Sequence, residues 1–121
     1  MTNAPGTTLV DVSPELLEQW LNDSEAILID IREDAEHANE RIPAAKHIPM
    51  GSLDPDALRL ANPDTRVVFH CHLGGRSSHA AMRFYCDDGP VYHLAGGIEA
   101  WKASGRGVNR PSTDLPINPE A

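Results

Sequence analysis

Apolar residues follow two patterns along this chain, and together they predict alternating strands and helices. Near-continuous apolar runs occur at 26–31 and 67–69, which is typical of parallel strands buried on both faces. Elsewhere apolar positions recur at helical spacing, as in the segment from Leu16 to Leu21. The alternation predicts an α/β fold, with a mostly parallel central β-sheet flanked by helices.

Local signals predict where these elements begin and end. Ser13 is a favourable N-cap and Pro14 suits the first helical position, so a helix is expected to begin there. The expected elements are strand 9–12, helix 14–21, strand 26–31, helix 33–39, turn 42–45, strand 46–49, helix 53–61, strand 67–69, helix 77–86, strand 91–94 and helix 98–103. Residues 9–108 are predicted to form one domain, between a flexible N-terminus at 1–8 and an extended or disordered tail at 109–121 that contains three prolines.

Charge and composition narrow the classes of partner. The net charge of -8 and the pI of about 5.0 argue against nucleic acid or a membrane surface. The first residues lack the basic and apolar blocks of a signal peptide, and no apolar run reaches the roughly 18 residues of a membrane span. The sequence therefore predicts a soluble, cytoplasmic protein.

One cysteine lies where a strand meets a glycine loop and a helix. Cys71 follows the apolar run 67–69, and a helix is expected to open soon afterwards at Ser77. The free N–H groups and the dipole of a helix N-terminus stabilise a thiolate, lowering a thiol pKa from about 8.5 to about 3.5–7.5. Cys71 is therefore predicted to be a nucleophile. Cys86, at the end of an apolar helical face, is predicted to be a small buried residue.

The segment after Cys71 is predicted to bind the group that this cysteine carries. It consists of His72, Leu73, Gly74, Gly75 and Arg76. Both glycines accept positive φ, so the loop can turn several N–H groups inward. Arg76 adds a permanent positive charge, either at the rim of the site or behind the loop.

Two charged residues near the end of another strand have two interpretations. Asp30 and Arg32 come at the carboxyl end of strand 26–31, an edge where ligands collect in parallel sheets. The preferred alternative is structural, with Asp30 accepting backbone hydrogen bonds and Arg32 pairing with a nearby acid such as Glu33 or Glu36.

The histidines do not indicate a metal site. Alternation along a strand turns His70 and His72 away from Cys71, and no second Cys or His pair has zinc spacing. We expect no metal and no cofactor. His79 and His93 are interpreted as surface or satisfied polar residues. A Cys–His hydrolase lacks a third residue, although His72 beside Cys71 keeps that alternative open.

Several motifs make the chain resemble the single-domain rhodanese-like sulfurtransferases. The resemblance covers residues 9–108 and rests on motifs at family spacing, which are Leu28-Ile29-Asp30-Ile31-Arg32 with Glu36, Arg41-Ile42-Pro43-Ala44-Ala45, Cys71-His72-Leu73-Gly74-Gly75-Arg76-Ser77 and Gly96-Gly97-Ile98-Glu99-Ala100-Trp101. It implies a rhodanese-like three-layer α/β domain.

The resemblance also implies a chemistry. Cys71 would take a sulfane sulfur from a small donor, such as thiosulfate or a low-molecular-weight persulfide, and hold it as a persulfide cradled by the loop amides. It would then pass this sulfur to a thiophilic acceptor such as a thiol or cyanide. Alternatively, the protein is a sulfur carrier that exchanges the persulfide with a partner protein of a sulfur relay.

The chain departs from the family pattern at two places. His72 stands where the family often has arginine, which lowers the fixed positive charge near pH 7. The segment Glu40–Ala45 replaces the family's Gly-His-Ile-Pro-Gly-Ala. Phosphatases of this fold form a third class, but their loop is one residue longer than the four residues between Cys71 and Arg76. The shorter loop favours sulfur over phosphate.

Overall fold

The computed structural model describes residues 7–84 and 89–110. The elements in chain order are β1 Thr7–Val12, α1 Pro14–Asn22, β2 Ala26–Asp30, α2 Asp34–Asn39, β3 Lys46–His47, the 3₁₀ turn η1 Met50–Ser52, α3 Pro55–Ala61, β4 Arg66–His70, α4 Gly75–Phe84, β5 Gly89–Leu94 and α5 Gly97–Ala103. Cys86, and the greater part of the predicted flexible N-terminus and tail, lie outside the described residues.

The five strands form one parallel sheet in the order β1-β5-β4-β2-β3. β4 lies at its centre, between β5 and β2, and its residues Val67 to Phe69 are buried. The apolar run therefore marks a central parallel strand, as predicted. Because every strand of a parallel sheet ends at the same edge, the residues after β2, β4 and β5 come together there.

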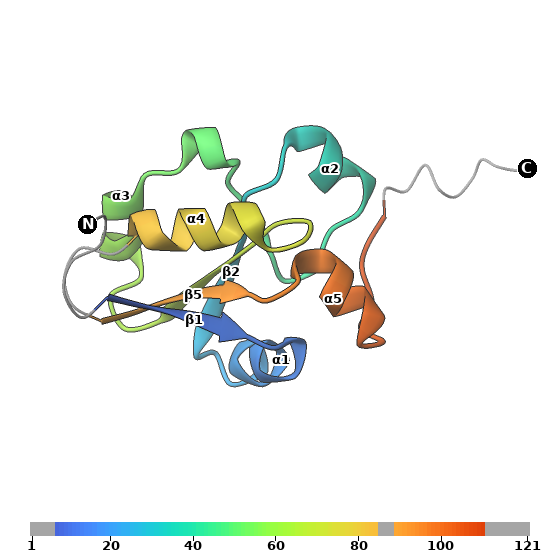
Figure 1. Cartoon of the computed structure of the whole chain (residues 1–121), viewed down its shortest axis with the longest axis horizontal. Helices are drawn as coiled ribbons and strands as arrows, with labels where there is room; N and C mark the ends of the chain where they lie inside the picture. Colours follow the sequence, from blue (N-terminus) through green and yellow to red (C-terminus); the bar gives the residue numbers. More distant parts are fainter. Residues whose placement is uncertain (1–6, 85–88, 111–121) are drawn as a thin grey trace, which may run out of the picture.

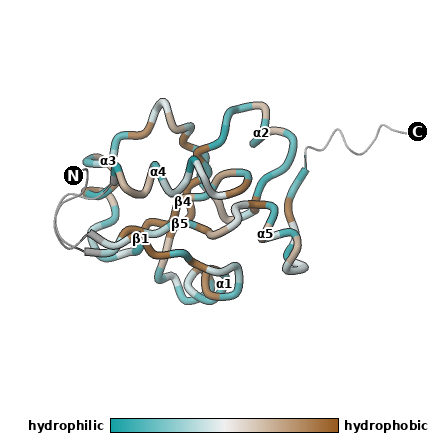
Figure 2. Tube along the Cα trace, viewed as in Figure 1, coloured by the Kyte–Doolittle hydropathy of each residue, from teal (hydrophilic) through white to brown (hydrophobic). Residues whose placement is uncertain are grey.

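Helices cover both faces of the sheet, which confirms the predicted three-layer α/β architecture (Figure 1). On one face α1 and α5 contribute Leu17 and Trp101 to a buried apolar cluster. On the other face α4 contributes Ala80 and Ala81 to a second cluster, against which Leu58 of α3 packs. Figure 2 shows hydrophobic segments gathered along β1, β4 and β5, between these layers.

Several predicted boundaries differ from the structure, most of them by one or two residues, and three of the differences bear on the fold or the site. β1 begins at Thr7, within the segment predicted to be flexible, because Thr7 and Thr8 pair with β5. The helix expected at 53–61 starts at Pro55, since Asp54 caps it by accepting a hydrogen bond from the Ala57 amide at 3.1 Å. α4 begins at Gly75 rather than at Ser77.

The start of α1 agrees with the prediction, and the contacts of the domain extend two residues beyond its predicted end at 108. The Ser13 hydroxyl caps α1 by accepting a hydrogen bond from the Leu16 amide at 3.1 Å. Asn109 forms an antiparallel bridge with Arg41, and Arg110 pairs with Glu40, so the chain still contacts the domain at these positions. Within 7–84 and 89–110, no helix is both long and apolar enough to cross a bilayer.

Candidate active site

Cys71 occupies the loop between the central strand β4 and helix α4. Its side chain is only 1% exposed. The sulfur accepts hydrogen bonds from the backbone amides of Gly74, at 3.0 Å, and Ser77, at 3.3 Å. The Ser77 hydroxyl lies 3.6 Å from the same sulfur. The predicted nucleophile is thus enclosed by hydrogen-bond donors in the loop and in the first turn of the helix.

These donors favour the thiolate. Burial alone would raise the pKa of the Cys71 thiol, because a buried anion loses its hydration. Hydrogen bonds from the Ser77 side chain and from the amides of Ser77, Gly74 and Arg76 outweigh that effect and lower the pKa below its ordinary value. The site can therefore stabilise one compact anion on or attached to the sulfur, and an activated thiolate of this kind is a nucleophile.

The two glycines of the loop have different roles. Gly74 has φ of 114°, a region that suits glycine, and this conformation aims its amide at the Cys71 sulfur. Gly75 is not among the glycines with positive φ, because it is the first residue of α4. The expectation that both glycines use positive φ was therefore wrong for Gly75. It assumed a loop that extends to Ser77, whereas the helix begins earlier.

The N-terminus of α5 holds the backbone of the Cys71 loop in place. The amide of Ile98 donates to the carbonyl of Cys71 at 2.9 Å, and the amide of Glu99 donates to that of His72 at 3.3 Å. This approach needs glycine at position 97, where φ is 62°. A Cβ atom there would lie 2.4 Å from the His72 carbonyl oxygen and 2.5 Å from that of Cys71.

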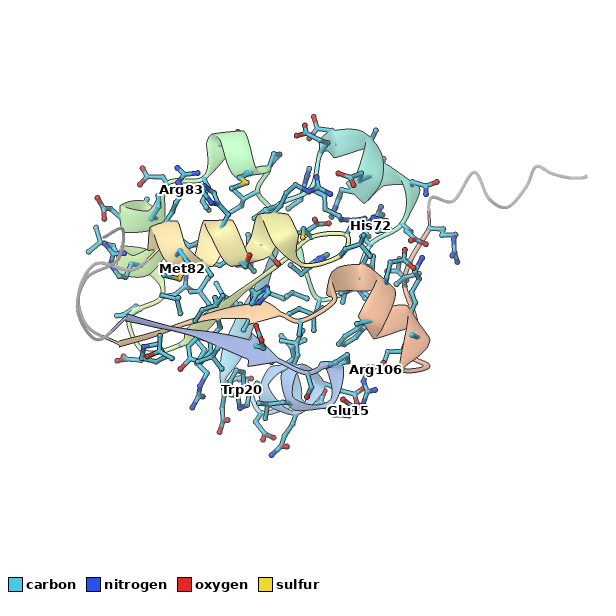
Figure 3. All side chains as sticks on the ribbon, in the orientation of Figure 1. Glu15, Trp20, His72, Met82, Arg83 and Arg106 are labelled. Carbon is cyan, nitrogen blue, oxygen red and sulfur yellow. The ribbon has the colours of Figure 1, made fainter. Side chains whose placement is uncertain are left out.

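The side chains of His72 and Leu73 lie at the surface next to Cys71. Figure 3 shows His72 between the start of α4 and α5. Its Nε2 atom lies 2.9 Å from the carboxylate of Glu99, and both side chains are exposed. Leu73 is 66% exposed. The imidazole of His72 is thus directed to a carboxylate on α5.

Arg76 connects the loop to α2, and its side chain remains partly exposed. Its two terminal nitrogens donate to the two oxygens of Glu36, each at 2.8 Å. This bidentate bond lowers the pKa of Glu36 to about 2 and raises the pKa of Arg76. A paired guanidinium fixes the first turn of α4 against α2, and it leaves the loop with less uncompensated positive charge.

Asp30 and Arg32 form a buried pair, as the structural interpretation expected, but with a different partner for Arg32. The Asp30 carboxylate accepts the Arg32 backbone amide at 3.0 Å and its side chain at 2.9 and 2.7 Å. Burial would raise the pKa of Asp30, but bonds from Arg32 and His37 and the nearby His70 hold it well below its usual range. Arg32 therefore pairs with Asp30, rather than with Glu33 or Glu36.

Three polar residues that successive hydrogen bonds connect to the sulfur were not predicted as part of the site. They are Ser77, His93 and Asp11, which come from α4, β5 and β1. Ser77 offered a signal, because it stands in the first turn of the helix after the loop. His93 is buried and satisfied by hydrogen bonds to the other two, whereas His79 is exposed. The three residues come together because β1 lies next to β5 in the sheet, and this strand order could not be read from the sequence.

A family model described as a rhodanese-like domain matches residues 13–104, which include every residue of the cysteine loop. The chain belongs to the rhodanese-like domain family. The predicted family resemblance is confirmed.

Several proteins similar to this rhodanese-like chain are named sulfurtransferases. The sulfurtransferase of Allochromatium vinosum is 38% identical over 103 residues, covering 84% of this chain and 95% of that protein. The putative sulfurtransferase YtwF of Bacillus subtilis is 34% identical over 100 residues, covering 82% and 96%. The uncharacterized protein slr1261 of Synechocystis is 35% identical over 100 residues, or 81% of this chain, and the match spans only 55% of that protein.

Solved structures show the same rhodanese-like fold. The chain is similar to a rhodanese-like domain protein of Staphylococcus aureus, with a TM-score of 0.61 and 27% identity over 84% of this chain and 98% of that one. It is also similar in fold to a thiosulfate sulfurtransferase of Pseudomonas aeruginosa. That match has a TM-score of 0.70 and 24% identity, and it covers 86% of this chain and 20% of that one.

Proposed function

We propose that this rhodanese-like protein is a sulfurtransferase that moves a sulfane sulfur through a persulfide on Cys71. The observation that carries the proposal is the set of donors around one buried sulfur, which are the amides of Gly74, Arg76 and Ser77 and the Ser77 hydroxyl. The names of the relatives support the same class of reaction. The substrates are a small sulfur donor and a thiophilic acceptor.

The reaction has two balanced steps. The Cys71 thiolate attacks the outer sulfur of the donor, an S–S bond forms, and the bond between that sulfur and the rest of the donor breaks. With thiosulfate the leaving group is sulfite, and with a low-molecular-weight persulfide it is the parent thiolate. The acceptor, a thiolate or cyanide, then attacks the terminal sulfur of the persulfide and returns Cys71 to its thiolate.

The charges around the loop bear on the choice of donor. The two basic side chains of the loop, His72 and Arg76, each face a carboxylate, from Glu99 and Glu36 respectively. A dianion such as thiosulfate gains less from paired cations than from free ones. We therefore propose that a low-molecular-weight persulfide reacts faster than thiosulfate at this site.

The same features favour sulfur over phosphate chemistry. Only four residues separate Cys71 from Arg76, which is a short loop for three phosphate oxygens. Both terminal nitrogens of Arg76 are bound to Glu36 before any substrate arrives. The cradle fits a single terminal sulfur better than a tetrahedral phosphate.

Mass spectrometry of the intact protein tests the proposal. Incubation with glutathione persulfide, polysulfide or thiosulfate is expected to add one sulfur atom, about 32 Da, which dithiothreitol removes. Cys71→Ser should form no adduct, whereas Arg59→Lys, a control on α3, should load like the parent. Cyanide or a small thiol should then unload the sulfur catalytically. If loading is rapid but only a protein acceptor unloads it, the carrier role is correct; aryl phosphate turnover with no sulfur adduct would overturn the proposal.

A further inference from the structure

We propose that Ser77, His93 and Asp11 form a proton relay that connects the buried Cys71 sulfur to the surface. The inference rests on the proposed use of a Cys71 thiolate, and it assigns to this reaction three residues outside the predicted cysteine loop. Ser77 touches the reacting sulfur. His93 and Asp11 act through Ser77 and are positioning residues.

The relay is a continuous chain of hydrogen bonds. The Cys71 sulfur lies 3.6 Å from the Ser77 hydroxyl oxygen, which lies 2.9 Å from Nδ1 of His93. On the other side of the ring, Nε2 lies 2.7 Å from the Asp11 carboxylate. The inner members are buried, with Cys71 at 1%, Ser77 at 0% and His93 at 6% exposure, whereas the side chain of Asp11 is 70% exposed. A proton that moves along these atoms therefore travels from the interior to solvent.

The sheet and α4 create this alignment together. Asp11 of β1 and His93 of β5 are partners in the parallel register, so their side chains emerge side by side on the same face. α4 packs over that face and brings Ser77 to the imidazole. Among the described contacts of the imidazole, Asp11 from β1 is the titratable group. The Cys71 sulfur stands one step further, and α4 contributes the neutral hydroxyl of Ser77.

The proton positions follow from the chemistry of each group. When Cys71 is a thiol, S–H donates to the Ser77 oxygen, the Ser77 hydroxyl donates to Nδ1 of His93, and Nε2–H donates to Asp11. Deprotonation passes the thiol proton to Ser77, the Ser77 proton to Nδ1, and the Nε2 proton through Asp11 to water. The ring is then neutral with its hydrogen on Nδ1, and the Ser77 hydroxyl points at the thiolate. Nε2 and the Asp11 carboxylate no longer share a hydrogen, so this contact is released and both atoms accept hydrogen bonds from water.

Burial makes such a route useful. At 1% exposure Cys71 has almost no direct contact with water, so its proton needs a path through the protein. The Ser77 hydroxyl also lies 3.1 Å from the carbonyl of Gly74, which is an alternative acceptor for the same hydrogen. Rotation of that hydrogen between Gly74 and the relay opens or closes the path without moving a heavy atom. Because the hydroxyl donates to the anion in the deprotonated state, the relay also stabilises the thiolate.

The test measures the tautomer of His93 by nitrogen-15 NMR while the Cys71 thiolate is followed by ultraviolet absorbance. In the parent protein, His93 is expected to change from Nε2–H to Nδ1–H in the same pH step that forms the thiolate. Alkylation of Cys71, which removes the thiol proton without any substitution, should keep the ring as Nε2–H across that step. No sulfur donor is used, so a failure here is distinct from a failure of sulfur transfer.

Variants test the order of the chain. In Ser77→Ala the His93 tautomer should no longer change in the pH step that forms the Cys71 thiolate. His93→Gln removes a ring that can hold the proton at either nitrogen, and it should lower the neutral-pH alkylation rate of Cys71 about tenfold. His79→Gln, an exposed change on the same helix, should leave both readouts at parent values. The relay would be refuted if the His93 tautomer did not change when Cys71 titrates in the parent protein. It would also be refuted if the tautomer still changed together with thiolate formation in Ser77→Ala.

Discussion

Replacing Gly97 by alanine should lower the stability of the protein by disrupting the contact between α5 and the cysteine loop. Gly105→Ala is a matched control. Gly97 has φ of 62°, and its added Cβ would lie 2.4 Å from the His72 carbonyl oxygen. Gly105 also has positive φ, 89°, but a Cβ there would have nothing within 4 Å. The two substitutions therefore share the backbone strain of a non-glycine residue, and only the first adds a collision.

The magnitudes follow from these contacts. Positive φ costs a non-glycine residue about 1–2 kcal/mol, which is the full expectation for Gly105→Ala. Since Cβ atoms essentially never approach within 3.0 Å, Gly97→Ala must shift the loop by about 0.6 Å, the difference between 3.0 and 2.4 Å. That shift disrupts the hydrogen bonds from Ile98 and Glu99, each worth about 0.5–1.5 kcal/mol. The expected total for Gly97→Ala is about 2–5 kcal/mol.

Urea unfolding of the parent and the two variants measures these differences directly. Gly97 lies closer than Gly105 to the centre of the left-handed region, near +57°, so strain alone would make Gly105→Ala the worse substitution. The contact argument predicts the opposite order. Equal destabilisation, or greater loss for Gly105→Ala, would refute it. Cys71 alkylation should also slow in Gly97→Ala and remain unchanged in Gly105→Ala.

Two more predictions concern the loop and its ion pair. Gly74→Ala should slow persulfide formation about 10²–10³-fold, because it displaces an amide donor from the sulfur. Gly75→Ala should react like the parent, because its added Cβ would lie in open space at a helical position. Similar rates for the two variants would contradict the assignment. Because the pKa of Glu36 falls from 4.5 to about 2, its contribution to stability is present above about pH 4.5 and disappears as the pH falls toward 2. When the pH falls from about 6 to about 3, the urea midpoint of Glu36→Gln should therefore decrease less than that of the parent. The difference should be modest, because the pair is partly exposed. An identical decrease in both proteins would exclude this role for the Arg76 pair.

The central strand and the nucleophile could be predicted because their signals are local. Val67 to Phe69 form an uninterrupted apolar run. A cysteine with two glycines a few positions later can be identified as a candidate loop without knowledge of any distant contact. The start of α4 was misplaced for a local reason as well. Ser77 resembles an N-cap and glycine is a poor helix former, yet Gly74 completes the turn and lets the helix begin at Gly75.

The rest of the site depends on contacts between segments far apart in sequence. The pairing of Arg76 with Glu36 spans 40 positions, and that of His93 with Asp11 spans 82. Glu36 was named for its place in a family motif and as a possible partner of another arginine, and Asp11 only as part of a strand, so neither contact with the site was predicted. Gly97 was recognised only as part of a family motif, although its lack of a side chain lets α5 approach the backbone of Cys71.

The order of the strands has a consequence for a chain that is still being synthesised. β1 is made first, but its neighbour in the sheet is β5, which is made last among the strands. The amides that hold the Cys71 loop belong to α5 and come later still. A nascent chain that ends before Gly89 therefore has a first strand without its partner β5. Until Gly97–Ala103 follow, it also has a Cys71 loop without support from α5. We expect Cys71 to be most open to oxidation, and β1 to aggregation, in the interval before β5 and α5 leave the ribosome.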